Sequence, residues 1–196
     1  MMSAEAIREA VVEDPVRLAL ARRGDAATLE QLYVDHIDAL LRHARALLHD
    51  VREAQDLAHD AFAVAFRTLP RFRGDATFGT YLHGIALNLA RRRWRHSART
   101  RAAMSALRWF SGRPTRNEPR LSEGIDAGRE VQALADAVET LRPAQREAFV
   151  LLLVEQLPGD EAARVAGVRP EVLRVRATRA KQAVRAAMRR RLGEET

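Results

Sequence analysis

Along residues 28–48, apolar side chains recur every three or four positions. The pattern starts at Leu29 and Leu32 and ends at Leu47 and Leu48, which is typical of a long helix with one buried face. Such a face must be covered by other elements, because exposed apolar surface is unfavourable in water. Period-two alternation and Asn-Gly or Asp-Gly hairpin turns do not occur in the chain, so no strand is expected. The sequence therefore predicts an all-α fold.

Residues that start and stop helices divide the first half of the chain into four helical segments. Asp50 and Glu53 have the spacing of a capping box, and Pro70 cannot continue a helix. Gly74 and Asp75 supply turn residues. The predicted helices run from Pro15, capped by Asp14, to Gly24; from Thr28 to Leu48; from Asp50 to Leu69; and from Thr77 or Phe78 into Arg91–Arg95. We expect them to pack antiparallel.

Helical spacing returns at Arg129 and continues on both sides of Pro143. A short helix is predicted near Asp160–Ala166, followed by a turn at Gly167 and a long basic helix from about Pro170. A short helix, a glycine turn and a basic helix occur in this order in helix-turn-helix units. The sequence therefore predicts a second core and a second small domain.

The charge of the chain narrows the class of its partners. A formal net charge of +7 favours a polyanionic partner, either nucleic acid or an anionic membrane surface. Lys181 is the only lysine, and both GC-rich codon usage and phosphate binding explain the arginine bias. The absence of cysteine excludes disulfides and thiolate zinc sites and fits a reducing cytosol. No apolar run approaches the roughly 18 residues that span a bilayer, so we expect a cytoplasmic protein without membrane insertion.

Residues 76–117 contain many arginines and no acidic side chain. A long block of one sign repels itself, and residues 97–128 also contain Gly112, Pro114 and Pro119. We therefore interpret residues 97–128 as an extended basic linker. The predicted organisation is two small helical domains, at residues 1–96 and 129–196, joined by this flexible linker.

Two separate parts of the chain resemble one protein family. Three segments are similar to region 2 of the extracytoplasmic-function (ECF) sigma factors: Glu53–Phe62 (EAQDLAHDAF), Leu69–Phe78 (LPRFRGDATF) and Tyr81–Asn88 (YLHGIALN). Further segments resemble region 4 of the same family: Leu141–Phe149 (LRPAQREAF), Glu161–Val168 (EAARVAGV), Val172–Arg176 (VLRVR) and Arg179–Lys181 (RAK). The two matches occur in the family's order across a basic linker, and together they cover most of the chain.

The resemblance implies a protein that binds core RNA polymerase, recognises the minus-ten and minus-thirty-five promoter elements, and promotes strand opening. Bond-making chemistry then belongs to the polymerase, so no enzyme activity, catalytic residue, cofactor or metal is expected. Anti-sigma factors are common partners in the resembled family, and we expect one here. By position, Gln55, Asp56 and Asp60 match the acidic surface that docks on the largest subunit of the polymerase. Carboxylates there would fix the orientation of docking on basic residues.

The resemblance also assigns DNA contacts. The residues matching the segment that captures the non-template strand of the minus-ten element are Phe72, Asp75, Tyr81, Asn88, Arg91, Arg93 and Trp94. Aromatic side chains stack on extruded bases and arginines neutralise phosphates, which together offset the cost of opening a duplex. The residues matching the reader of the minus-thirty-five element are Glu171, Arg174, Arg176 and Arg179. Their spacing reaches both base edges and phosphates, and Glu171 is placed to accept a hydrogen bond from cytosine.

Several positions depart from the family pattern. Arg92 stands where an acidic residue is usual, and Tyr81 stands where tryptophan is usual. Pro158 and Gly159 replace the usual pair before the first helix of the helix-turn-helix, and Pro170 and Val172 replace small or hydroxylated residues at the second. Proline is tolerated in a first helical turn, so the fold is expected to survive. The promoter sequence, the inducing signal and the identity of the anti-sigma factor stay open.

Two other functions are compatible with parts of this pattern. A sigma-like mimic or helix-turn-helix regulator would bind partners or DNA without programming initiation. A nuclease would use Asp56 and Asp60 as paired carboxylates, but no nucleotide loop or convergent base accompanies them. His36 and His43 share a helix face without a third ligand at a suitable spacing, so we interpret them as ordinary histidines.

Trp109 and Phe110 are two large apolar residues in an otherwise polar linker. We interpret them as residues that dock into a channel of the polymerase. Replacing both with alanine should then impair holoenzyme assembly and abortive transcription.

Overall fold

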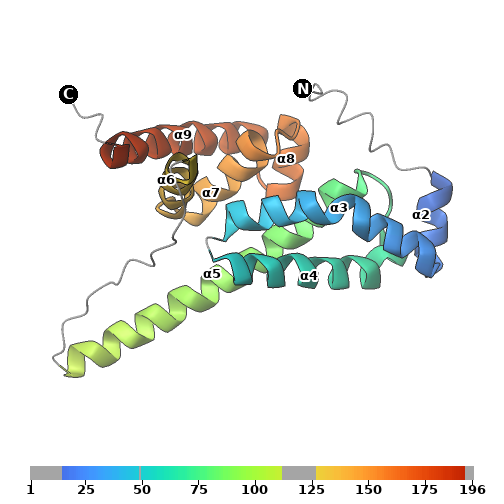
Figure 1. Ribbon diagram of the computed structural model, residues 1–196, viewed down its shortest axis with the longest axis horizontal. Helices are drawn as coiled ribbons and strands as arrows, with labels where there is room; N and C mark the ends of the chain where they lie inside the picture. Colours follow the sequence, from blue (N-terminus) through green and yellow to red (C-terminus); the bar gives the residue numbers. More distant parts are fainter. Residues whose placement is uncertain (1–14, 49, 112–126, 193–196) are drawn as a thin grey trace.

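The computed structural model describes residues 15–48, 50–111 and 127–192, with side chains described outside residues 101–132 and 192. Every element in these ranges is helical, which confirms the predicted all-α class (Figure 1). The elements are α2 (Pro15–Arg22), α3 (Ala26–Leu47), α4 (Val51–Thr68), η1 (Leu69–Arg71), α5 (Phe78–Ser111), α6 (Ala127–Glu139), α7 (Pro143–Phe149), η2 (Val150–Val154), α8 (Gly159–Ala166) and α9 (Pro170–Leu192). None of these helices is long and apolar enough to cross a membrane.

Helices α2 to α5 form an N-terminal unit in which α3, α4 and α5 pack against one another. Each of these three contributes fully buried apolar side chains, including Leu32, Leu57 and Leu82. Phe78, the first residue of α5, is also fully buried and packs near Phe66 of α4. The predicted apolar face of residues 28–48 is therefore the face that α4 and α5 cover.

The caps that start α3 and α4 come from the sequence immediately before them. The Asp25 carboxylate accepts hydrogen bonds from the Thr28 amide at 2.9 Å and the Thr28 hydroxyl at 2.5 Å. These bonds lower the pKa of Asp25, because they stabilise its charged form. Asp50 accepts from the amides of Arg52 and Glu53 at 2.9 and 3.0 Å, as its predicted cap role requires. The predicted cap Asp14 lies outside the described residues.

Helix α5 is longer than the sequence led us to expect. It continues to Ser111, whereas we placed the start of an extended linker at residue 97. Residues 97–111 contain alanine, arginine and leucine, which favour helix, and lack glycine and proline until Gly112. Local helix preference therefore outweighs the repulsion among the arginines. The side chains of Trp109 and Phe110 lie outside the described residues.

Helices α6 to α9 form a C-terminal unit. One of its clusters joins Ala137, Val138 and Leu141 at the end of α6 to Ala180, Val184 and Ala187 of α9. Helix α8 ends at Ala166. The next residue, Gly167, has a φ of 69°, the left-handed conformation that favours glycine, and α9 begins at Pro170. The predicted helix-turn-helix is present with the predicted boundaries.

The two units share part of one core, where we expected two separate cores. Val150, Leu151, Ala162 and Leu173 of the C-terminal unit are buried in the same cluster as the leucines of α3, α4 and α5. Helices α7 and α8 contain only 7 and 8 residues, and α6 and α9 cover only part of their apolar surface. The remainder packs on the N-terminal unit, where η2 meets α3 and α8 meets α5.

Candidate nucleic-acid interface

A cleft of about 490 Å³ lies between the loop before α5, the first turns of α5, and α8. It brings together four of the seven residues predicted to capture the minus-ten strand: Phe72, Asp75, Tyr81 and Asn88. Arg71, Arg73 and Arg164 add cationic side chains to its wall. A cleft lined by aromatic rings and guanidinium groups has the chemistry that holds an extruded base and its phosphates.

The two aromatic residues of the cleft are held in fixed positions. The Phe72 and Tyr81 rings are stacked, with centroids 4.6 Å apart. The Tyr81 hydroxyl and the Thr68 hydroxyl form a hydrogen bond of 2.5 Å, and the Arg22 guanidinium lies 5.9 Å from the centre of the Phe72 ring. Both rings are half-buried, so each keeps part of its surface available in the cleft.

Three predicted DNA-binding residues of α5 lie outside the lining of this cleft and make contacts within the protein. Arg91 forms two hydrogen bonds with the Glu147 carboxylate, from Nε at 2.7 Å and Nη2 at 2.8 Å. Nη2 also donates to the Ala166 carbonyl at 2.8 Å. The bonds to Glu147 raise the pKa of Arg91. In this arrangement Arg91 joins the two units, so its side chain reaches DNA only when that contact is released.

Arg93 and Trp94 are also engaged within the protein. Arg93 donates to the Asp60 carboxylate at 2.8 Å and to the Glu53 carbonyl at 2.5 Å. The Arg146 guanidinium of α7 lies 5.5 Å from the centre of the Trp94 ring, and the buried Trp94 Nε1 has no hydrogen-bond partner. Trp94 is half-buried against the core, so packing accounts for much of its environment.

The predicted acidic docking surface lies on one side of α4. Gln55, Asp56 and Asp60 are all exposed, with Asp56 and Asp60 one helical turn apart. Asp60 forms the ion pair with Arg93, while keeping 60% of its side chain exposed. The surface is accessible to a basic partner, and its charge is partly neutralised at Asp60.

The helix-turn-helix presents its second helix, α9, to solvent. Glu171, Arg174 and Arg179 are exposed, and Arg176 is half-buried. Leu173, Ala177 and Ala180 are buried, which fixes the opposite face of the helix against the core. The Arg174 guanidinium also lies close to Gly159, at the start of α8. All four predicted minus-thirty-five residues therefore lie on one helix, with three of them on accessible surface.

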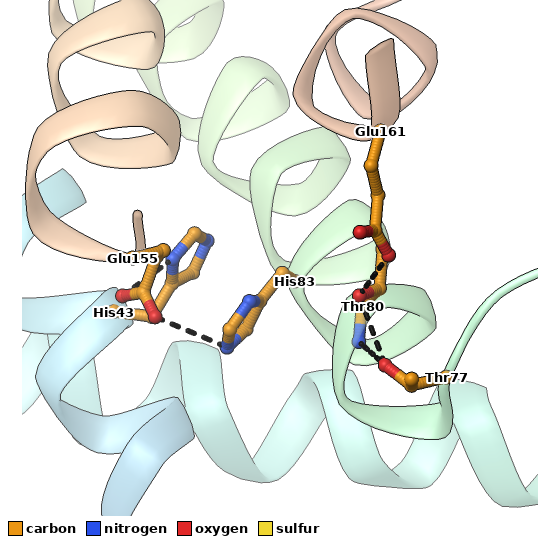
Figure 2. Close-up of polar contacts among 6 residues, drawn as sticks. All are labelled: His43, Thr77, Thr80, His83, Glu155 and Glu161. Carbon is orange, nitrogen blue, oxygen red and sulfur yellow. Dashed lines mark hydrogen bonds and ion pairs between the residues drawn. The ribbon is translucent and has the colours of Figure 1, made fainter. Parts of the chain in front are cut away.

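Contacts between the units include polar groups that the sequence did not reveal. The Thr80 hydroxyl donates to the Glu161 carboxylate at 2.7 Å and lies 3.0 Å from the Thr77 hydroxyl (Figure 2). Arg146 donates to the Leu47 carbonyl at 3.1 Å, and Arg164 donates to the Asp75 carbonyl at 3.3 Å. Apart from the local Thr77–Thr80 contact, these contacts join residues far apart in the chain, so spacing along the sequence carries no signal for them.

A second polar group at this junction contains His43 of α3, His83 of α5 and Glu155, the residue after η2 (Figure 2). We call it the histidine–glutamate cluster. Burial, reinforced by His43, holds the pKa of His83 well below its ordinary value. From the sequence, His43 shares a helix face with His36 and has no third ligand at a suitable spacing, because 112 positions separate it from Glu155.

Models of the sigma-70 family match both units of the chain. The model described as sigma-70 region 2 matches residues 32–100, and the model described as sigma-70, region 4 matches residues 131–184. Their order along the chain is that of the two units, and together they cover more than half of it. The matched ranges include the acidic surface of α4, every residue that lines the cleft, and the helix-turn-helix as far as residue 184.

Curated relatives match along nearly the whole chain. The RNA polymerase sigma-H factor of Pseudomonas aeruginosa is 28% identical over 181 residues, which cover 90% of this chain and 94% of that protein. The RNA polymerase sigma factor CnrH of Cupriavidus metallidurans is 26% identical over 172 residues, which cover 86% of this chain and 90% of CnrH. The ECF RNA polymerase sigma factor SigE of Mycolicibacterium smegmatis is 30% identical over 165 residues, which cover 83% of this chain and 63% of SigE.

Two solved structures share the fold. The structure of CnrH in complex with the cytosolic domain of CnrY has a TM-score of 0.61 at 25% identity and covers 87% of this chain and 94% of that chain. The sigma factor RpoE in complex with the anti-sigma factor NepR, from Bartonella quintana, has a TM-score of 0.58 at 20% identity and covers 82% and 96%. With regions 2 and 4 in order and relatives matched over most of its length, the chain belongs to the sigma-70 family, as an extracytoplasmic-function RNA polymerase sigma factor.

Proposed function

We propose that this sigma factor binds core RNA polymerase through Gln55, Asp56 and Asp60, holds the non-template minus-ten strand at the cleft, and reads the minus-thirty-five element with α9. In this proposal the chain selects the promoter and opens the DNA strands, and the polymerase carries out bond formation. We place the protein in the cytoplasm, where core polymerase and promoter DNA are found.

The main support for this proposal is the structure of the cleft. The stacked Phe72 and Tyr81 rings, 4.6 Å apart, stand beside Asn88 and several arginines in one cavity. An unpaired base gains about 1–3 kcal/mol by stacking on an aromatic side chain, which offsets part of the cost of unstacking it. The half-buried rings, held by the Thr68 and Arg22 contacts, are already ordered before a base arrives. This arrangement favours capture of a single strand over readout of an intact duplex.

Several interactions within the protein must be released for the full set of predicted contacts to reach DNA, including those of Arg91 and Arg93. Arg91 is bound to Glu147, and α8 lines the cleft through Glu161 and Arg164. On release, Arg91 would exchange the Glu147 carboxylate for a DNA phosphate, which also accepts two hydrogen bonds from one arginine. Asn88 accepts a bond from Arg91 at 3.3 Å and is otherwise exposed, so it is free to change partner with Arg91.

The decisive experiment reconstitutes the chain with core RNA polymerase and sequences the transcripts made from a promoter library. We expect transcripts that start at a fixed distance from two shared sequence elements. Stable binding to core polymerase without specific transcripts would favour the sigma-like mimic instead. Magnesium-dependent DNA cleavage that is lost in Asp56→Asn would favour the nuclease.

Variants separate the three proposed surfaces. Asp56→Arg should slow association with core polymerase by about tenfold at low salt, because it reverses a steering charge. Arg67→Ala, on the same helix, serves as its control.

Tyr81→Ala should weaken open-complex formation while Tyr81→Phe retains it, because phenylalanine keeps the stacking face. Unchanged open complexes in Tyr81→Ala would remove the cleft from the proposal.

The recognition helix is tested by sequence preference. Arg174→Ala should cost about 1–3 kcal/mol on the preferred minus-thirty-five sequence and relax the preference at one position. Lys181→Ala removes the same charge from α9 and should weaken binding evenly across sequences. Equal behaviour of the two variants would mean that Arg174 contacts only phosphate.

An anti-sigma factor is part of the proposal. CnrH, which is 25% identical in the structural comparison, is seen in complex with the cytosolic domain of CnrY. Co-purification of the chain with a partner that blocks core binding, and that core polymerase displaces, would support this assignment.

A further inference from the structure

We propose that His43, His83 and Glu155 form a binding site for one divalent transition-metal ion, with Zn²⁺ as the best fit. The three residues come from α3, from α5 and from the turn after η2, so the ion would join the N-terminal and C-terminal units. Of the side chains that the structure describes, these offer one ligand atom each, all within 4.8 Å of one another.

Both imidazoles turn a nitrogen toward the Glu155 carboxylate, as Figure 2 shows. Glu155 Oε1 lies 3.2 Å from His43 Nδ1, and Glu155 Oε2 lies 3.7 Å from His83 Nε2. The two imidazole rings are stacked, with centroids 4.3 Å apart and an angle of 11° between their planes. The His43 side chain is fully buried, and those of His83 and Glu155 are 11% and 14% exposed. Burial at this level excludes most of the water that would otherwise compete for an ion.

Each imidazole of this cluster turns one nitrogen toward Glu155 and leaves its other nitrogen without a partner. His43 Nε2 and His83 Nδ1 are buried and have no hydrogen-bond partner. A buried polar atom without a partner costs about 1–3 kcal/mol. These two nitrogens lie on the side of each ring away from Glu155, so they are a cost of burying the cluster, and the proposed site rests on the nitrogens that face the carboxylate. Both imidazoles face a single carboxylate, and the burial that disfavours charge on His83 keeps that ring in the neutral form that binds metals.

The chemical types of the three ligands indicate which metal ion would bind. Two imidazoles and one carboxylate are the ligand set of zinc sites that keep a further position open for water. Zinc binds imidazole nitrogen and carboxylate oxygen at about 2.0–2.2 Å, so tetrahedral ligand atoms lie about 3.4 Å apart. The Glu155 oxygens are already 3.2 and 3.7 Å from the facing nitrogens of His43 and His83. An imidazole nitrogen binds a metal in the plane of its ring, so binding also requires one of the two stacked rings to turn out of the stack. Magnesium and calcium prefer sets of oxygen ligands, so a site with two nitrogens disfavours them.

The backbone that presents Glu155 is unusual, which supports a dedicated role for this residue. The π-helix Val150–Val154 ends with the Glu155 amide bonded to the Val150 carbonyl at 2.9 Å. The next residue, Gln156, has a φ of 50°, in the left-handed region that residues other than glycine rarely adopt. π-helical turns and such strained residues gather at functional sites, and both occur here within two residues of the carboxylate.

Zinc titration of the full, metal-free chain tests the proposal, with a chromophoric chelator as competitor. We expect one equivalent of Zn²⁺ to bind, and at least about tenfold weaker binding in each of His43→Gln, His83→Gln and Glu155→Gln. His36→Gln serves as the matched control, because His36 is a buried histidine on the same helix as His43. His59→Gln controls for surface histidines. Circular dichroism identifies any variant that has failed to fold, and Glu155→Gln keeps the side chain's shape.

Three outcomes would overturn the site. The first is the absence of a one-to-one zinc complex in the unmodified chain. The second is full retention of binding by folded Glu155→Gln, which would remove the ligand from the C-terminal unit. The third is equal loss of binding in His59→Gln, which would place the ion on the surface. None of these measurements uses polymerase or DNA, so failure of the metal site and failure of the proposed function are distinguishable.

Discussion

Gly167 shows how one residue sets the turn of the helix-turn-helix. Its φ of 69° closes α8, and the amide of Gly167 donates to the Arg164 carbonyl at 3.2 Å. An added Cβ at Gly167 would meet no atom within 4 Å, so a side chain there would cost backbone strain and no packing clash.

We predict that Gly167→Ala lowers the free energy of unfolding by about 1 kcal/mol, which is the cost of the left-handed conformation for a residue with a Cβ. Gly159→Ala is the control. Its Cβ would lie at ordinary contact distance from the Arg174 side chain, so its effect should stay within about 0.5 kcal/mol. Urea denaturation measures both. Equal destabilisation by the two changes would contradict the assignment of strain to Gly167.

Breaking the Arg91–Glu147 ion pair should lower the free energy of unfolding by a measurable amount. The Glu147 side chain is 7% exposed, so water stabilises its negative charge little and the Arg91 guanidinium must do so instead. We predict that Arg91→Met lowers the free energy of unfolding by about 3 kcal/mol, because it leaves a buried charge unpaired. Arg91→Met combined with Glu147→Met should recover most of that loss, because two apolar side chains replace the pair.

Arg92 provides the control for this cycle, because it is exposed beside Arg91 on the same helix. Arg92→Met should change the free energy of unfolding by less than about 0.5 kcal/mol. If the double replacement is no more stable than Arg91→Met alone, the buried charge of Glu147 is not the source of the loss.

At the scale of elements, local capping chemistry decides where the helices begin. We predict that Asp50→Ala lowers the free energy of unfolding by about 1 kcal/mol, because it removes the acceptor for the first amides of α4. Asp50→Asn should retain most of this stability, since an amide oxygen also caps. Thermal and urea unfolding measure the difference, and equal loss in both variants would point to the charge of Asp50 rather than to the cap.

This local character explains what the sequence predicted well. The boundaries at Asp50, Phe78, Gly167 and Pro170 follow from residues within a few positions of each helix end, and the structure confirms them. The grouping of Phe72, Tyr81 and Asn88 in one cleft also follows from neighbouring segments. The extension of α5 to Ser111 was missed because charge repulsion was given more weight than helix preference.

The contacts between units could not be predicted in the same way. Thr80 and Glu161 are 81 positions apart, and Arg91 and Glu147 are 56 positions apart. Nothing in the local sequence of Arg91 distinguishes a partner in the protein from a phosphate on DNA. The π-helix before Glu155 has the apolar composition of an ordinary buried turn, so its geometry depends on packing against α3.

At the scale of the whole molecule, the packed arrangement and promoter binding require different distances between the two units. The minus-ten and minus-thirty-five elements are about 25 base pairs apart, which is about 80 Å along a duplex with a rise of about 3.4 Å per base pair. In this structure α8 contacts α5 directly, and both units share a buried core. A chain that holds both elements at once must therefore separate its units.

We predict that core polymerase converts the chain from this packed arrangement to a separated one. The chain has no cysteine, so Val34→Cys and Gln182→Cys, at exposed positions in the two units, place two dyes specifically. Energy transfer should be high in the free chain and should fall when core polymerase is added. Glu161→Gln, which weakens the bond to Thr80, should lower the transfer of the free chain, while Glu171→Gln, on the exposed face of α9, should not. Transfer that stays high in the core complex would mean that the units remain packed, and a single chain could not then reach both elements.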